Sequence, residues 1–215
     1  MITQPIHYQS IQEIQYSYKN KTETPVSVTE HFLKRIESLD PDLKSYATVM
    51  SESALKQAEF LGKLDDDDIA KLSLYGIPIA LKDLCYTDGV LTMGGTAVLE
   101  DHIPDYDATV VAKLKSAGAI ILGKLNLTEG AMAGYNPRRD VPKNPWNFDK
   151  WPGVSSSGSG VSTAAGLCVG SLGSDTGGSI RFPSASCGLV GIKPTYGRVS
   201  RHGVLDLAET LDHVG

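Results

Sequence analysis

The first 75 residues show apolar positions that recur at helical spacing, with one short run that does not. Helices are expected over about 10–18 and 52–61, because their apolar residues return every three to four positions. Residues 46–50 form the one strand expected in this region. The acidic run 65–68 lacks the alternating acids and the glycine of a calcium loop, so we expect a solvated loop there.

A further helix of this region is expected to begin at a capping box. Ser27 can accept an N–H of the first turn while Glu30, three residues later, reaches back to the Ser27 amide. This helix is expected to bury one face against the rest of the protein. The apolar side chains that define the face are Val28, Phe32, Ile36 and Leu39.

From residue 76 the pattern changes to short apolar runs separated by helices, which is typical of an α/β protein. Buried strands that alternate with helices imply crossover connections and a mainly parallel sheet. Residues 134–154 contain four prolines and are expected to form a long loop. The expected strands are 77–81, 119–122 and 189–192, and the expected helices are 109–117, which Gly118 ends, and the uncharged run 160–170.

The glycines divide the chain in two, because only Gly62 of the 22 precedes residue 76. We therefore expect an N-terminal helical layer, residues 1–75, and a differently built core, residues 76–215. A net charge of -5 gives no electrostatic reason to bind nucleic acid or an anionic membrane. No run of about 18 apolar residues occurs, and the first residues lack the basic and apolar regions of a secretory signal, so we expect neither a membrane span nor a signal peptide. A cytoplasmic protein is expected.

The cysteines and histidines do not form metal-binding patterns. Cys85, Cys168 and Cys187 are odd in number and too widely spaced for a metal site, so we expect reduced thiols. The five histidines form no pair at ligand spacing. No metal and no cofactor are expected.

Residues 151–197 are rich in glycine and serine, which is also the composition of a flexible linker. A linker is disfavoured here, because the segment encloses the helix-like run 160–170. Within it, Asp175–Ser179 places two glycines before a serine, and successive N–H groups can form an oxyanion nest there. The base could be Lys82 at the end of the apolar run 77–81, where burial lowers the pKa of an ammonium. The alternative is a lysine that extends from a strand end into solvent.

Separated motifs of this chain resemble the amidase signature enzymes, and they occur in the right order. The resemblance covers most of the chain and is strongest from residue 74 onwards. It implies an α/β fold with a mixed, mainly parallel sheet covered by helices. The motifs are Gly76–Asp83, Trp151–Ser159, Gly173–Pro183, Val190–Ser200 and Glu209–Gly215.

The resemblance implies a Ser–cis-Ser–Lys triad that hydrolyses amides through an acyl-enzyme. Ser179 would be the nucleophile, Ser155 the bridging serine after a cis peptide bond, and Lys82 the base. Supporting roles would fall to Ser174, Asp175 and Arg181. The oxyanion hole would use the backbone N–H groups of Thr176, Gly177, Gly178 and Ser179.

The segment around the bridging serine departs from the commoner family text, Gly-Gly-Ser-Ser-Gly-Gly-Ser. Here the chain reads Gly153-Val-Ser-Ser-Ser-Gly-Ser159, so Val154 replaces a glycine before the implied cis bond. Counting back from the nucleophile places the bridging serine at Ser155, and Ser156 is the alternative.

The function implied by the resemblance is an amidase that hydrolyses a carboxylic C–N bond to an acid and an amine or ammonia. Its partner would be a small-molecule amide, with no nucleic acid and no membrane, and a homodimer is compatible with this role. One alternative is the amidase component of the tRNA-dependent amidotransferase, which frees ammonia from glutamine beside partner subunits. Another is a family member without catalysis, which retention of all three triad residues disfavours.

The length also bears on the fold, because amidase signature proteins are usually much longer than 215 residues. The sequence ends within the last motif, at Gly215. We therefore expect residues 76–215 to be the N-terminal part of a larger catalytic core, and an isolated fragment to fold poorly and lack activity.

Overall fold

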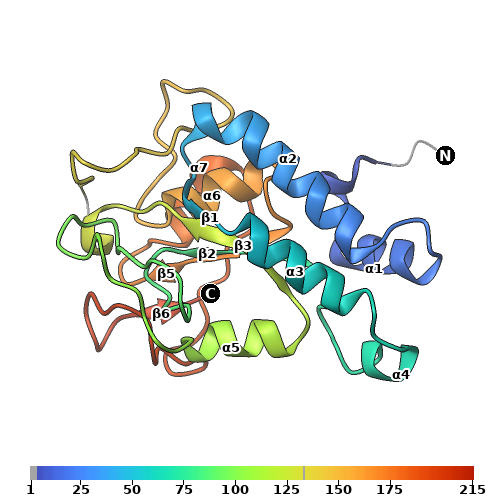
Figure 1. Cartoon of the computed structure of the whole chain (residues 1–215). Helices are drawn as coiled ribbons and strands as arrows, with labels where there is room; N and C mark the ends of the chain where they lie inside the picture. The colour runs from blue at the N-terminus through green and yellow to red at the C-terminus, as the bar shows by residue number, and fades with distance from the viewer. Residues whose placement is uncertain (1–3, 133) are drawn as a thin grey trace.

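The computed structural model describes residues 4–132 and 134–215. The strands of its central sheet are β1 (Tyr46–Val49), β2 (Pro78–Lys82), β3 (Ile120–Leu125) and β4 (Gly170–Leu172). They lie in the order β1-β3-β2-β4 (Figure 1). β2 runs parallel to β3 and β4, whereas β1 is antiparallel to β3. The expected mixed, mainly parallel sheet is confirmed.

Helices lie on both sides of this sheet. They are α1 (Ile11–Lys19), α2 (Pro25–Leu43), α3 (Ser51–Leu61), α4 (Asp66–Ile69), α5 (Thr109–Ser116), α6 (Ser157–Ala164) and α7 (Arg181–Cys187), with single 3-10 turns at η1 (Ile6–Tyr8) and η2 (Glu129–Ala131). In Figure 1, α2, α6 and α7 lie above the sheet and α5 lies below it. Within the described ranges, none of the helices is long and apolar enough to span a membrane.

The first 75 residues contribute to the central sheet as well as to its cover. β1 comes from this region and pairs with β3. Phe32 of α2 and Leu61 of α3 belong to the same buried cluster as Leu81 and Ile121 of the strands. Because apolar side chains of both regions exclude water together, the two regions share one core.

Helix α2 begins earlier than the sequence predicts. Its N-cap is Thr24, whose hydroxyl accepts the Ser27 N–H at 3.0 Å, while the Ser27 hydroxyl accepts the Thr24 N–H at 2.9 Å. Pro25 occupies the first helical position, where the absence of an N–H costs nothing. The expected capping box of Ser27 and Glu30 is therefore wrong. The buried face is confirmed at Val28, Phe32 and Ile36, whereas Leu39 is exposed.

Two other elements differ from expectation. The acidic run forms the short helix α4 rather than a loop, because the Asp65 side chain accepts the Asp68 N–H at 2.9 Å and caps it. The uncharged run expected as a helix over 160–170 is divided, since α6 covers 157–164 and β4 begins at Gly170. The positive φ of Gly166 lies in the turn between them, where a helix cannot continue.

Residues 189–192 do not form the expected strand. The Leu189 N–H donates to the backbone oxygen of Ser184, in the middle of α7, instead of to a neighbouring strand. Val190 and Ile192 are 92% and 70% exposed. An apolar run becomes a strand only where another strand accepts its backbone hydrogen bonds, and no described strand lies beside this one.

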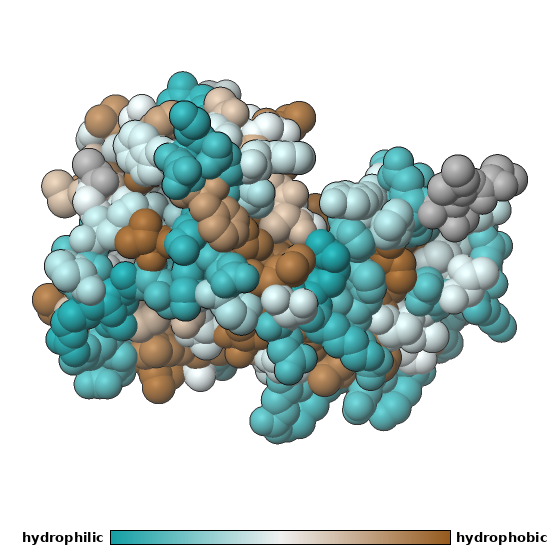
Figure 2. All heavy atoms as spheres, turned by 90° about the horizontal axis from the view of Figure 1, so that it is seen from above, coloured by the Kyte–Doolittle hydropathy of each residue, from teal (hydrophilic) through white to brown (hydrophobic). Residues whose placement is uncertain are grey.

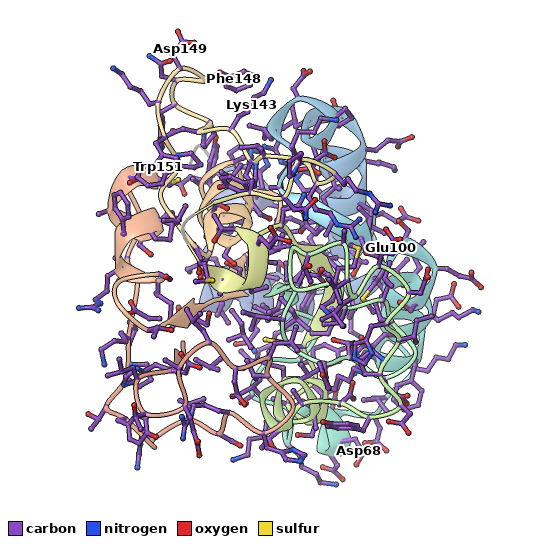
Figure 3. The ribbon with its side chains drawn as sticks, turned by 90° about the vertical axis from the view of Figure 1, so that its left-hand side faces the viewer. Asp68, Glu100, Lys143, Phe148, Asp149 and Trp151 are labelled. Atoms are coloured by element: carbon purple, nitrogen blue, oxygen red, sulfur yellow. The ribbon has the colours of Figure 1, made fainter. Side chains whose placement is uncertain are left out.

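The expected loop 134–154 lacks helices and strands over its length. Figure 3 shows Phe148 and Asp149 at its outer end and Trp151 beside α7. The Trp151 ring meets the Phe182 ring of α7 edge-on at 5.1 Å.

The face of the molecule that Figure 2 shows mixes hydrophilic and hydrophobic side chains instead of presenting one continuous apolar area.

Gly123 of β3 is a point at which two strands approach very closely. A Cβ there would overlap the backbone oxygen of Thr48 and press on the Tyr46 ring. We expect Gly123→Ala to lower the free energy of unfolding by about 1–3 kcal/mol, because a packed sheet cannot widen locally. Urea unfolding of the full-length protein measures this change. Gly62→Ala, where the nearest atom is at ordinary contact distance, is the control and should change stability little.

Candidate active site

Lys82 ends β2 and points its amine into the protein rather than into solvent. Its side chain is fully buried, and Nζ donates to Ser155 Oγ at 2.7 Å and to Ser174 Oγ at 2.9 Å. Burial lowers the pKa of Lys82 to about 7, although Cys85, Asp175 and Asp212 act in the opposite direction. A large share of Lys82 is therefore neutral at pH 7, and a neutral amine can accept a proton.

Ser155 lies just after loop 134–154 and shortly before α6. The Val154–Ser155 peptide bond is cis, as the resemblance implies. Gly153 allows the loop to reach this position, because its φ is positive and a Cβ would overlap the Pro183 backbone of α7. The glycine thus lets the chain pass close to α7 and bring Ser155 over Lys82.

Ser156, the alternative bridging serine, has different partners. Its hydroxyl donates to the Ser174 oxygen at 3.1 Å and accepts the Ser174 N–H at 3.2 Å. These bonds join the start of α6 to β5 (Ser174–Asp175) and leave Ser156 without a contact to Lys82 among the hydrogen bonds of the described residues. The geometry therefore favours Ser155 over Ser156.

Ser179 lies in the turn that follows β5, and it is half-buried. Its backbone oxygen accepts the Ser156 N–H at 3.2 Å, which brings the turn next to the bridging serine. Within the described residues, the Ser179 hydroxyl makes no hydrogen bond to another side chain. The structure therefore joins Lys82 to Ser155 directly, and it joins Ser179 through the backbone to Ser156, the neighbour of Ser155.

Asp175 holds the turn in shape. Arg181 binds it with two nitrogens, Nη2 to Oδ1 at 2.9 Å and Nε to Oδ2 at 3.0 Å, and Oδ2 also accepts the Ile180 N–H at 3.1 Å. Burial alone would raise the pKa of this carboxyl, but the hydrogen bonds from Arg181 and the amides outweigh it and lower the pKa to about 2. Asp175 is therefore an ionised anchor at neutral pH.

One expected oxyanion donor is already engaged. The Gly178 N–H donates to Asp175 Oδ1 at 2.8 Å, so the expectation that it is free for a substrate oxygen is corrected. Gly178 adopts a φ of 136°, a conformation that favours glycine and that lets the turn fold back on the carboxylate. In the described structure, the amides of Thr176, Gly177 and Ser179 donate to no protein acceptor and remain the candidate donors.

A second buried lysine lies on the neighbouring strand. Lys124 of β3 contacts Asp83 at 3.3 Å and donates to Thr92 Oγ1 at 2.6 Å. Burial raises the pKa of Asp83 to about 6 and lowers that of Lys124. This pair was not predicted from the sequence, although Asp83 follows the candidate base directly. It fixes the backbone beyond β2, because Asp83 Oδ2 also accepts the Met93 N–H at 3.0 Å.

Asp212 is another residue that sequence reasoning missed. It precedes β6 (His213–Val214), which pairs with β5, and Oδ1 accepts a hydrogen bond from the Thr176 hydroxyl at 2.5 Å. The residue lies inside one of the motifs that carry the resemblance, but its contact with the turn depends on strand pairing and could not be read from spacing.

A buried lysine hydrogen-bonded to a serine after a cis bond, beside a Gly-Gly-Ser turn on an α/β sheet, is the arrangement expected of the amidase signature enzymes. The chain belongs to the Amidase family, whose sequence profile matches residues 27–215.

Known relatives and solved structures agree with this assignment. The chain is 59% identical to the putative amidase AmiD of Mycobacterium tuberculosis over 89% of its length. It is 50% identical, over 88% of its length, to the A subunit of the glutamyl-tRNA(Gln) amidotransferase of Syntrophobacter fumaroxidans. The native peptide amidase of Stenotrophomonas maltophilia superposes with a TM-score of 0.91 over 98% of the chain, at 34% identity.

The match covers less than half of each of these proteins. The chain spans 40% of both sequence relatives and 45% of the peptide amidase. Over the part that is matched, the superposition on the peptide amidase shows that this chain has the amidase-signature fold.

Proposed function

We propose that the full-length protein hydrolyses a carboxylic amide through an acyl-enzyme on Ser179, with Ser155 as proton bridge and Lys82 as base. The observation that carries the proposal is the 2.7 Å contact between the fully buried Lys82 amine and the Ser155 hydroxyl. Burying an ammonium is costly, so burial favours the neutral form of Lys82, and the neutral amine lies where it can take a proton from Ser155.

The proposed reaction begins when Ser179 Oγ attacks the amide carbon. The Ser179 proton moves to Ser155 Oγ, whose own proton moves to Lys82 Nζ. The carbonyl oxygen gains negative charge, and the amides of Thr176, Gly177 and Ser179 would donate to it. The proton then returns along the same path to the leaving nitrogen as the C–N bond breaks. Water attacks the ester by the same steps, which releases the acid and restores Ser179.

The test uses the full-length protein and a panel of amides. The panel contains short aliphatic amides, aryl amides, C-terminal peptide amides and glutamine. We expect hydrolysis of at least one class. A fluorophosphonate, which reacts with an activated serine and stays attached, should leave an adduct on Ser179 that mass spectrometry of the peptide detects. An adduct on another residue alone, or turnover by a protein that the probe does not label, would contradict the proposed mechanism.

A second candidate is the release of ammonia from glutamine within a complex, as the name of the 50% identical amidotransferase protein suggests. In that case hydrolysis would depend strictly on glutamine, and the protein would co-purify with partner subunits. Turnover of aryl or peptide amides by the purified protein alone would favour the independent amidase. The geometry around Lys82 serves both reactions, so the substrate panel decides between them.

A further inference from the structure

The two short strands bring a downstream segment against the turn that carries Ser179. Asp175 pairs with His213 across β5 and β6, so Thr176 and Asp212 lie opposite each other just beyond the paired residues. The Thr176 hydroxyl donates to Asp212 Oδ1 at 2.5 Å. The pairing of β5 with β6 thus places the Asp212 carboxylate beside the start of the turn.

Asp212 is itself held firmly. Its second oxygen, Oδ2, accepts the Leu207 N–H at 2.8 Å and the Ala208 N–H at 2.9 Å. Its own amide donates to the Ala208 oxygen at 2.9 Å, and the residue is only 8% exposed. The carboxylate cannot turn away from Thr176 without breaking these bonds. The two bonds that Oδ2 accepts are charge-assisted and therefore stronger than bonds between neutral groups.

The carboxylates of Asp175 and Asp212 contact different parts of the turn. Asp175 binds the amides of Gly178 and Ile180, which lie at its far end. Asp175 does not bind the amides of Thr176 and Gly177 in the described structure, and the Thr176 hydroxyl donates to Asp212 instead. Two of the three available amides, those of Thr176 and Gly177, therefore lie in the part of the turn that Asp212 contacts.

We propose that Asp212 is a positioning residue for amide hydrolysis, which acts through the Thr176 hydroxyl to hold the amides of Thr176 and Gly177 in place for the substrate oxygen. This inference rests on the proposed function. A second effect follows from charge, since Asp212 acts with Cys85 and Asp175 to raise the pKa of Lys82 against burial. Loss of its charge should lower that pKa, whereas loss of the Thr176 hydroxyl should not.

The test compares Thr176→Val, Thr176→Ser and Asp212→Asn in the full-length protein, on an amide that the unaltered protein hydrolyses. Thr176→Val is expected to lower kcat by about 10- to 100-fold with little change in KM, because the amides act mainly in the transition state. Thr176→Ser keeps the hydroxyl and should restore most of kcat. Asp212→Asn should lower kcat and also move the acid limb of the pH profile to lower pH.

Asp206→Asn, an exposed carboxylate in the same segment, is the matched control and should leave both kcat and the pH profile unchanged. The proposal is overturned if Thr176→Val keeps full kcat, if Thr176→Ser fails to rescue, or if Asp212→Asn leaves the acid limb in place. Should Thr176→Val fail to fold by circular dichroism, the contrast between Thr176→Ser and Asp212→Asn decides. A full-length protein that neither hydrolyses amides nor forms the Ser179 adduct refutes the proposed function itself, and this inference falls with it.

Discussion

Ser179→Ala is expected to lower kcat for amide hydrolysis by about 10⁴-fold or more, because it removes the atom that forms the acyl-enzyme. Ser179 is half-buried in the turn between β5 and α7, so a substrate can reach its hydroxyl while the turn remains anchored by Asp175. Steady-state kinetics of the full-length protein measure the loss, and mass spectrometry should show that the covalent adduct disappears with it.

The control for this substitution is Ser186→Ala, which removes a hydroxyl from α7, the helix that follows the turn. The Ser186 side chain makes no hydrogen bond within the described part of the chain, so activity should be unchanged. Turnover by Ser179→Ala within tenfold of the unaltered protein would show that another group is the nucleophile.

Lys82→Met should reduce kcat by a similarly large factor, about 10³-fold or more, since the members of a triad act as a unit. Methionine fills the buried space of the lysine stem but cannot accept a proton. In the unaltered protein, kcat/KM should rise with pH and reach half of its plateau near pH 7, because the pKa of Lys82 is about 7 and only the neutral amine is a base. Lys150→Met, at an exposed position, is the control and should change neither kcat nor the pH profile.

The same substitution tests the pKa through stability. The pKa of Lys82 is lowered from 10.5 to about 7 in the folded protein, so the unfolded chain binds more protons between these values. The free energy of unfolding of the unaltered protein should therefore rise with pH across this window, through the contribution of Lys82. Lys82→Met should lack that rise. An identical pH dependence in both proteins would mean that Lys82 keeps an ordinary pKa.

Local patterns predicted most of the elements that surround the site. Strands β2 and β3 were predictable because a short continuous apolar run between turns is typical of a strand buried on both faces. Helices α1, α3 and α5 were predictable from their apolar spacing. The start of α2 was not predictable. Thr24 with Ser27 and Ser27 with Glu30 can each form a cap, and only the backbone conformation of the folded chain shows that Thr24 is the N-cap.

Residues 189–192 are a case in which the local pattern predicts an element that the fold does not form. Their composition favours a strand, but a strand requires a partner with free backbone groups, and pairing is a property of the tertiary arrangement. The short helix α4 shows a third case, in which a single aspartate cap outweighs the repulsion among its acidic neighbours.

Within the site, the residue types and order of the motifs indicated Lys82, Ser155 and Ser179 without any coordinates. The sequence by itself thus determined the family, the strands that carry Lys82 and its neighbours, and the chemical groups available. Only the tertiary structure decided that Ser155 rather than Ser156 meets Lys82, that the Gly178 amide is engaged by Asp175, and that Asp212 reaches Thr176. The physical reason is that hydrogen bonds depend on separations of about 3 Å, and such separations between residues distant in sequence are set by strand register and packing.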